Sequence, residues 1–541
     1  MLAPSIVCAH IIFCPGSRSS PLTLAAARHP RAKLIPGIDE RSLGYWALGH
    51  AKARNKPCVI ITSSGTAVAN LLPAVVEASQ SNTPLIILSA DRPSELRDTG
   101  SNQTIDQVGI FGKYVRWEMD LQAPGEEVLV RQFLTAIDNA VRYATSSPDP
   151  GPVHLNCQFR DPLNPKVVPW GDRLLDGLDQ WLQSSTPFSA AGSGFLETNF
   201  HSTSPELEDI ILNPKGILVL GEMKTPCDIA ASIRLATLLG WPVFADLLAG
   251  VRIGSASVPG GEFKLINHFD QMLLSREHWE QMKPCSILHL GGRLTSKRLS
   301  EFLAWAVLEE QTKAPTKYML VRQERTRYDP FHIVKYRLDC SVECLVEAAA
   351  KIISETGTQV DSLCRDAFAK QFVELDSVVS NSIEQAAQDH TCMTEVHVAK
   401  VVSECLPFGH GLFIGNSMPI RDLDMFGGPR KALASKEHLG APIASNRGAS
   451  GIDGVLSTAA GFADGLGRKC TLVVGDVSFL HDVNGLNLLR TGSQSPPLTV
   501  VLVNNNGGGI FNFLPISGDV PEEQFRPFWT TPQHVDIAGM P

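Results

Sequence analysis

Short apolar runs separated by helix-length amphipathic segments constrain the fold of this 541-residue chain more than any other feature. They include PCVIITS, TPLIILSA, KGILVLGE, CSILHLGG, CTLVVGD and LTVVLVNN, and most end in Gly, Ser, Asp or Asn. A strand that is apolar throughout is typical of a parallel sheet covered by helices on both faces. The pattern predicts an α/β fold of doubly wound domains with mainly parallel sheets, whose ligands bind beyond the carboxyl ends of the strands.

Two shifts in composition divide the chain into three α/β segments. After GPVHLNCQFRDPLNP the sequence becomes rich in Ser, Gly and Thr between Ser184 and Ser204, and a second shift covers Ser354 to Ser382. The length also exceeds what one hydrophobic core usually serves. We therefore predict domains at residues 1–180, 205–350 and 390–541.

Composition excludes several classes of protein. Apolar residues make up 43% and charged residues 19%, which is typical of a folded globular chain. The net charge is −9 and no Lys/Arg block stands out, which argues against a nucleic-acid partner. The longest apolar runs are strand-sized, too short for a membrane span. The 12 cysteines are scattered without zinc-ligand spacing, which favours free thiols in a reducing compartment and a soluble protein.

The segment GDVSFLHDVNGLNLLRTGSQSPPLTVVLVNNNGGGIF carries a candidate metal site. One predicted strand ends at Asp476 and the next, after about one helical crossover, ends at Asn505. A carboxylate and an amide oxygen at adjacent strand ends suit Mg²⁺, and the following glycines let the backbone approach a phosphate. A strand-end Asp that only caps a helix would give the same pattern.

Five other predicted strand ends carry cations or amides among small residues: CPGSRSSPLTLA, SADRPSELRDTGSNQTIDQ, LGGRLTSKRL, GNSMPIRDLD and SNRGASGIDG. A single surface Arg is usually a solvated charge. Five such turns indicate a pocket for several carboxylates.

A further segment, IDERSLGYWALGHAKA, begins a predicted helix with Glu40. An acid at the start of a helix commonly just complements the helix dipole.

The ordered segments CPGSRSSPLTLA, SGTAVANLLPAVVEAS, ADRPSELRDTGSNQTIDQ, SNRGASGIDGVLSTAAG and NNNGGGIFNFLP closely resemble the thiamine-diphosphate-dependent 2-succinyl-5-enolpyruvyl-6-hydroxy-3-cyclohexene-1-carboxylate synthases. The resemblance runs from about Phe13 to the end of the chain and is weakest between Trp170 and Pro214. It implies a pyrimidine-binding domain, a middle domain without cofactor and a diphosphate-binding domain. It also implies a homodimer or homotetramer with active sites between subunits.

The resemblance implies a transferase of menaquinone or phylloquinone biosynthesis that uses thiamine diphosphate and Mg²⁺, with Mn²⁺ as a substitute. The enzyme would decarboxylate 2-oxoglutarate and add the succinyl carbanion equivalent to isochorismate. Family members occur in the bacterial cytoplasm and the plastid stroma. Two alternatives remain open: another thiamine-diphosphate carboligase or 2-oxoacid decarboxylase, and a catalytically silent scaffold.

Matching motif positions imply a role for individual residues. Glu40 resembles the acid that activates the cofactor through its pyrimidine ring, and Ile452 resembles the apolar prop that bends the cofactor. The implied Mg²⁺ ligands are Asp476, Asn505 and the carbonyl of Gly507, although Val477 stands where the commonest motif has Gly. Other cofactor-pocket positions are Ser417, Ile510, Phe511 and Leu514. The positions that match substrate carboxylate binders are Arg18, Arg92, Asn102, Gln103, Lys297, Arg298, Arg421 and Arg447.

Both ends of the sequence differ from the family pattern. The chain starts almost at the first predicted strand, MLAPSIVCAHII, and stops at DIAGMP, shortly after the cofactor loop. From sequence we expect a truncated last domain, and a chain that is less active and less stable than one extended at this end.

Overall fold

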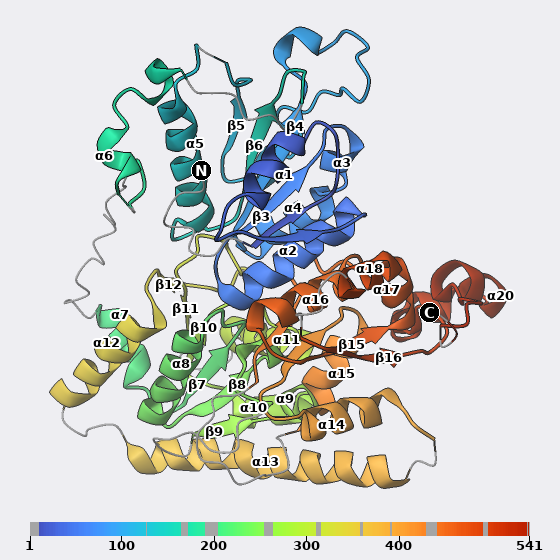
Figure 1. The fold of residues 1–541 in the computed structure, drawn as a ribbon. Helices are drawn as coiled ribbons and strands as arrows, with labels where there is room; N and C mark the ends of the chain where they lie inside the picture. The colour runs from blue at the N-terminus through green and yellow to red at the C-terminus, as the bar shows by residue number, and fades with distance from the viewer. Residues whose placement is uncertain are drawn as a thin grey trace. The chain divides into compact units, whose positions relative to one another are not determined.

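The computed structural model describes residues 10–125, 127–163, 171–184, 186–189, 204–253, 263–309, 315–356, 361–389, 392–428, 441–490, 496–537 and 539 (Figure 1). Their strands form three sheets, two of six strands and one of four. The strand pairs whose register is defined are all parallel. The predicted α/β class with parallel, doubly wound sheets is confirmed.

The first sheet has the strand order β2-β1-β3-β4-β6-β5. Its strands are β1 (His10–Phe13), β2 (Lys33–Pro36), β3 (Cys58–Thr62), β4 (Leu85–Asp91), β5 (Glu118–Leu121) and β6 (Pro152–Gln158). The helices of this segment are α1 (Ser20–Ala27), α2 (Glu40–Arg54), α3 (Thr66–Ala69), α4 (Leu72–Gln80), α5 (Val130–Thr145) and α6 (Asp179–Leu182).

Alternate residues of these strands face two different helical layers. Ile12 and Ile60 pack with α2 and α4, whereas Ile11 and Val59 pack with α5. Both faces are therefore covered, which explains why the strands are apolar throughout and show no alternation with polar residues.

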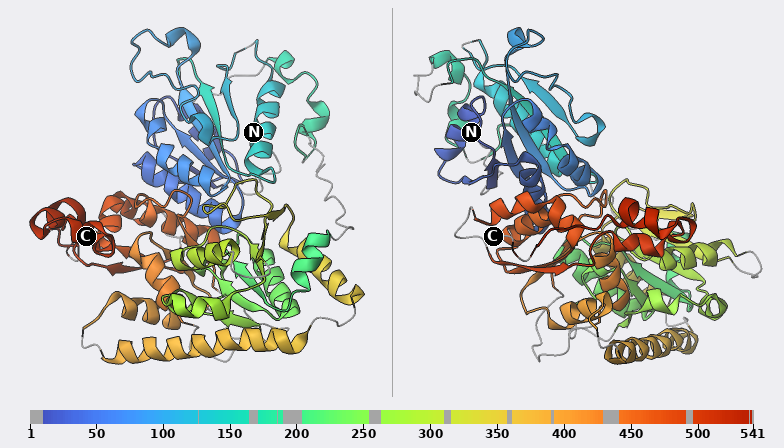
Figure 2. Two further views of the ribbon diagram at one scale, coloured as in Figure 1. Left: turned by 180° about the vertical axis from the view of Figure 1, so that it is seen from behind. Right: turned by 90° about the vertical axis from the view of Figure 1, so that its right-hand side faces the viewer.

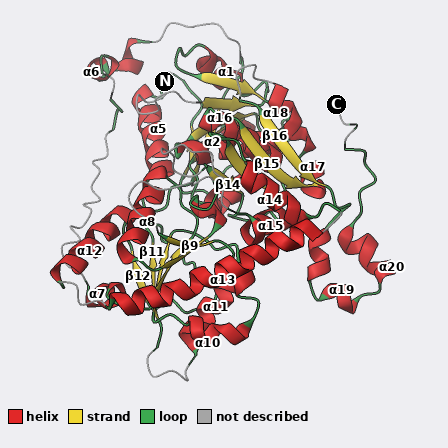
Figure 3. Ribbon diagram, turned by 90° about the horizontal axis from the view of Figure 1, so that it is seen from below, coloured by secondary structure: helices red, strands yellow, loops and turns green. Residues whose placement is uncertain are grey.

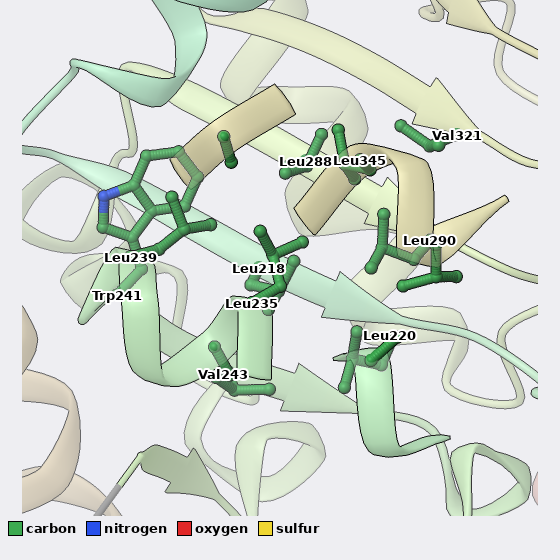
Figure 4. Close-up of a cluster of buried hydrophobic side chains, with 14 of the residues drawn as sticks. Leu218, Leu220, Leu235, Leu239, Trp241, Val243, Leu288, Leu290, Val321 and Leu345 are labelled. Atoms are coloured by element: carbon green, nitrogen blue, oxygen red, sulfur yellow. The ribbon is translucent and has the colours of Figure 1, made fainter. Parts of the chain in front are cut away.

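The second sheet has the order β12-β11-β10-β7-β8-β9. Its strands are β7 (Gly216–Leu220), β8 (Pro242–Ala245), β9 (Lys264–Ile266), β10 (Ser286–Leu290), β11 (Lys317–Val321) and β12 (Tyr336–Leu338). On one face Leu218 and Leu220 pack with α7 (Pro205–Ile211), α8 (Pro226–Leu239) and α12 (Val342–Glu355) (Figure 4). The other face packs with α9 (Phe269–Met272), α10 (Trp279–Met282), α11 (Lys297–Leu308) and α13 (Ser362–Asp389). Helix α13 is one uninterrupted element of 28 residues (Figure 2).

The third sheet has the order β14-β13-β15-β16, with β15 beside β16 (Figure 3). Its strands are β13 (Gly411–Ile414), β14 (Ile443–Ser445), β15 (Cys470–Gly475) and β16 (Leu498–Val503). Leu412 and Ile414 pack with α14 (Glu395–Cys405) and α15 (Met418–Phe426). The remaining helices are α16 (Val455–Leu466), α17 (Asp476–His481), α18 (Leu486–Arg490), α19 (Ile516–Asp519) and α20 (Glu522–Phe525).

The chain divides into two compact units. Unit 1 comprises Met1–Phe195, Asn446–Leu472 and Val477–Thr499, and unit 2 comprises Leu196–Ser445, Val473–Asp476 and Val500–Pro541. Each sheet lies within one of the three segments predicted from composition, and the boundaries at 1–180, 205–350 and 390–541 stay predictions. Among the described helices, none has the length and hydropathy that a membrane crossing requires.

Candidate active site

The carboxyl edge of the third sheet gathers the candidate metal and diphosphate residues of unit 2. Ser417, Asp476 and Asn505 follow β13, β15 and β16, which are neighbours in the sheet. Asp476 is only 3% exposed, and its carboxylate accepts a hydrogen bond from the Gly507 backbone N–H at 2.7 Å. The structure therefore brings Asp476 and Gly507 together at one strand-end edge, where doubly wound sheets bind ligands.

The loop after β16 needs glycine at its turning point. Gly507 has φ +131°, and a Cβ there would lie 2.0 Å from the Thr530 carbonyl oxygen. The neighbouring Gly508 N–H donates to the same carbonyl at 2.6 Å. Because these positions carry no side chain, the backbone N–H and C=O groups of the loop are accessible to a ligand.

A pocket of about 420 Å³ opens at this loop, lined among others by Asn505, Gly507, Gly509 and Arg526. Its lining offers the Asn505 amide, glycine backbone, the Glu522 carboxylate and the Arg526 guanidinium, and the Asp476 carboxylate contacts the Gly507 N–H of the same loop. Hard oxygens suit Mg²⁺, which takes the rest of its shell from water and phosphate. The residues present thus fit a Mg²⁺–diphosphate group.

Four further candidates lie around this loop and the end of β13. Ile510 and Phe511 are half-buried in the 3₁₀ helix Gly509–Phe513, and Leu514 is 44% exposed just after it. Ser417 has φ +68°, a conformation that costs a non-glycine residue energy and that concentrates at functional sites. The Arg421 guanidinium donates to the Ser417 carbonyl, one helical turn back.

In unit 1, Glu40 is held at the first position of α2. The Asp39 side chain caps this helix, accepting from the Arg41 N–H at 2.9 Å and the Ser42 N–H at 3.3 Å. Glu40 is half-buried beside the Cys14 thiol, whose pKa is raised by burial first and then by the charge of Glu40. The carboxyl group therefore sits in a partly apolar setting at the edge of the first sheet.

Ile452 belongs to the same unit and is 38% exposed. Its carbonyl accepts a hydrogen bond from the Ser478 hydroxyl at 2.9 Å. Gly454, two residues after Ile452, must be glycine, because a Cβ at this position would lie 1.9 Å from the Tyr45 ring. Tyr45 in turn donates its hydroxyl to Asp453. These contacts fix the backbone on both sides of Ile452.

Arg18, Arg92 and Gln103 converge at the carboxyl edge of the first sheet. Arg92 donates to the Ser64 hydroxyl and, at 3.1 Å, to the Gln103 carbonyl, while the Gln103 side chain donates to the Ser64 carbonyl at 2.7 Å. Arg18 donates to Phe159 O at 2.8 Å. Burial, and next the charge of Arg18, lower the pKa of Arg92. Arg18 also pairs with the Asp161 carboxylate at 3.2 Å, and the charges of Asp91 and Asp161 act on Arg92 in the opposite direction to that of Arg18.

The other carboxylate candidates lie in different surroundings. Asn102 is exposed in the loop before Gln103, and Arg421 lies on α15. Lys297 is 86% exposed and pairs with Glu301 at 3.5 Å, whereas Arg298 pairs with the Asp270 carboxylate. Three of the carboxylate candidates belong to unit 2: Lys297, Arg298 and Arg421. The others belong to unit 1: Arg18, Arg92, Asn102, Gln103 and Arg447.

Sequence reasoning missed Glu77, which anchors the loop that carries Arg447. The Glu77 carboxylate, 1% exposed, accepts from the Gly448 N–H at 2.9 Å and the Ala449 N–H at 2.6 Å. The Lys52 ammonium lies 3.3 Å away. One signal was available: an acid at an apolar helical position in PAVVEAS must find partners, because an unpaired buried charge is too costly.

Two family models match the chain. Residues 6–110 match "Thiamine pyrophosphate enzyme, N-terminal TPP binding domain", and residues 172–414 match "Middle domain of thiamine pyrophosphate".

Curated relatives match almost the whole sequence. The 2-succinyl-5-enolpyruvyl-6-hydroxy-3-cyclohexene-1-carboxylate synthases of Prosthecochloris aestuarii and Chlorobium limicola are 39% and 40% identical over 97% of this chain and 85% of their own lengths. "Protein PHYLLO, chloroplastic" of Arabidopsis thaliana is 38% identical over 98% of this chain. The chain spans 31% of that longer plant protein.

Proposed function

Because this chain belongs to the thiamine-diphosphate-dependent 2-succinyl-5-enolpyruvyl-6-hydroxy-3-cyclohexene-1-carboxylate synthases, we propose that it decarboxylates 2-oxoglutarate and transfers the succinyl unit to isochorismate. One structural observation carries the choice of substrates. Both substrates are dicarboxylates, and the guanidiniums of Arg18 and Arg92 are each held by hydrogen bonds at a strand-end edge, where they supply fixed positive charge.

We propose that the strand-end residues of unit 2 hold Mg²⁺ and the cofactor diphosphate. Asp476, the Asn505 amide oxygen and the Gly507 carbonyl are the protein ligands, and the glycine loop presents backbone to the phosphates. When bound, thiamine diphosphate supplies the carbon nucleophile and the electron sink for decarboxylation. By motif position, Ser417 and the apolar Ile510, Phe511 and Leu514 would contact the rest of the cofactor.

The residues of unit 1 would act on the cofactor ring and the substrates. Glu40 would hold a proton at the pyrimidine ring of the bound cofactor. Ile452, with its backbone fixed by Ser478 and Tyr45–Asp453, would support the cofactor with its apolar side chain. Arg18, Arg92, Gln103 and Arg447 bind carboxylates, as do Asn102, Lys297, Arg298 and Arg421 by motif position. Fixed cations stabilise charge that develops during the reaction without having to reorganise.

The test of this proposal combines two assays on the purified chain with thiamine diphosphate and Mg²⁺. We expect CO₂ release from 2-oxoglutarate, and the succinyl product by mass spectrometry only when isochorismate is present. Preference for pyruvate would identify a different carboligase. Tight cofactor binding without turnover of any 2-oxoacid would identify a silent scaffold. Either outcome contradicts the proposal.

We predict that Arg92→Met raises KM for at least one of the two substrates by about 10–150-fold. This range corresponds to losing a charge-assisted hydrogen bond of about 1.5–3 kcal/mol. Melting curves of the same variant separate lost substrate binding from lost stability, because Arg92 is buried and also donates to Ser64 and Gln103. The matched control is Arg160→Met, an exposed Arg paired with Glu95. Unchanged KM values for both substrates would show that Arg92 binds no carboxylate.

We also propose a homo-oligomer in which Glu40 of one copy and Asp476 of another serve the same cofactor. We predict that Glu40→Gln and Asp476→Ala chains, each inactive, regain about a quarter of the parent activity when mixed. In a random mixture half of the dimers are mixed, and each of these has one intact site. Subunit exchange is verified with differently tagged copies. Exchange without recovered activity would mean that both residues act within one chain.

For location, we propose a reducing compartment, either a plastid stroma or a bacterial cytoplasm. Each cysteine within the described ranges is a free thiol, and the named relatives include a chloroplastic protein and bacterial synthases.

A further inference from the structure

Three side chains with metal-ligating atoms meet in unit 1, and the proposed reaction assigns none of them a role. The Asp464 Oδ2 atom lies 3.1 Å from His50 Nδ1 and 3.9 Å from His10 Nε2. One ligand atom from each residue lies within 4.8 Å of the other two. His50 is separated from Glu40 by about 15 Å along the axis of α2, since a helix rises about 1.5 Å per residue.

The convergence follows from an unusually close approach of α2 and α16 (Figure 1). A Cβ on Gly49 would lie 1.9 Å from the Thr458 carbonyl oxygen, and one on Gly461 would lie 1.9 Å from the Trp46 carbonyl oxygen. The two helices therefore touch backbone to backbone through glycines. This contact brings His50 of α2 within hydrogen-bonding distance of Asp464 of α16, and His10 of β1 lies beside both.

The residue types suit a cation. An aspartate oxygen and two imidazole nitrogens are ligand types that Zn²⁺ prefers.

The geometry also matches zinc. The side chains of His50 and Asp464 are each 3% exposed and that of His10 is 14% exposed, so one edge of the cluster reaches water. Tetrahedral Zn²⁺ with bonds of about 2.0–2.1 Å places its ligand atoms about 3.3 Å apart, which small side-chain rotations would provide. His50 then needs the tautomer with its proton on Nε2.

Lys33 forms an ion pair with the second carboxylate oxygen of Asp464. Its ammonium lies 3.4 Å from Asp464 Oδ1, and its side chain is 47% exposed. Without a metal, this ammonium supplies the counter-charge that a buried carboxylate requires. Because the side chain is half in water, the ammonium can move into solvent when a divalent cation takes its place.

We propose that His10, His50 and Asp464 bind one Zn²⁺ ion, with water as the fourth ligand. The ion would tie β1, α2 and α16 together and would stabilise unit 1. It is separate from the Mg²⁺ proposed at Asp476.

The test titrates the chelator-treated full chain with Zn²⁺ by calorimetry, and with Co²⁺ as a spectroscopic probe. We expect one Zn²⁺ per chain, a higher melting temperature with the metal, and the visible bands of tetrahedral Co²⁺. His10→Gln, His50→Gln and Asp464→Asn should each weaken Zn²⁺ binding at least tenfold. His29→Gln, at a half-buried histidine of the same unit outside the cluster, and Asp476→Ala should retain it.

Lys33→Met separates a metal site from a purely structural ion pair. Removing the competing ammonium should tighten Zn²⁺ binding severalfold, whereas the metal-free chain should melt at a lower temperature. This variant also keeps the test valid if His50→Gln fails to fold. Absence of saturable Zn²⁺ binding by the parent chain would overturn the proposal. So would binding that the three ligand substitutions leave unchanged, or that Asp476→Ala removes.

Discussion

Glu40→Gln is expected to reduce decarboxylation of 2-oxoglutarate by about 10²–10⁴-fold, the usual contribution of a positioned acid–base group. The amide has nearly the same shape as the carboxylate, and the Asp39 cap that holds the start of α2 remains. It cannot, however, hold or release the proton that the aminopyrimidine tautomer requires. Binding of thiamine diphosphate and Mg²⁺ should therefore persist while kcat falls.

The measurement combines CO₂ release with a cofactor titration on the same preparation. Glu355→Gln is the matched control, because this exposed acid of α12 forms a surface ion pair with Lys351. Surface pairs of this kind contribute little to stability. If Glu40→Gln turns over as fast as the control, another group activates the cofactor.

Asp476→Ala is expected to lower Mg²⁺-dependent affinity for thiamine diphosphate by at least about 100-fold. Loss of an outer-shell partner of a metal site typically costs 10–100-fold, and Asp476 is proposed as a direct ligand. Its carboxylate also accepts the Gly507 N–H, so the substitution removes an anchor of the glycine loop as well. Asp476→Asn, which keeps the volume but not the charge, should show most of the loss.

Calorimetric titration with and without Mg²⁺ measures this effect, and melting curves exclude global unfolding as its cause. The control is Asp366→Ala on α13, an exposed acid that pairs with Lys264. Equal cofactor affinity with and without Mg²⁺ in the parent chain would show that the strand-end oxygens of β15 and β16 do not form a metal site.

The sequence by itself determined the class of the fold and the family. Strands such as CVIIT and GILVL are buried at every position, because helices cover both faces of their sheets. That burial makes each strand apolar throughout, so the run of apolar residues in the sequence was enough to predict a parallel sheet covered on both faces. The long motifs carried the family assignment in the same way, because each is contiguous in the chain.

The chemistry at strand ends was partly predictable for a related reason. Parallel strands place their carboxyl ends along one edge, so Asp476 could be expected near Gly507, and Arg18 near Arg92. The sequence did not say which partner each cation would take. Arg298 pairs with Asp270, a contact between distant segments that no local pattern indicates.

Only the tertiary structure decided which buried charges meet. Glu77 reaches the backbone of Gly448, and Asp464 lies against His50 and Lys33, across several hundred residues of sequence. Such pairings depend on how helices pack, here on glycines that let α2 and α16 touch. Periodicity shows that a helix has a buried face, but a buried carboxylate has many possible partners along the chain. Packing alone selects one of them.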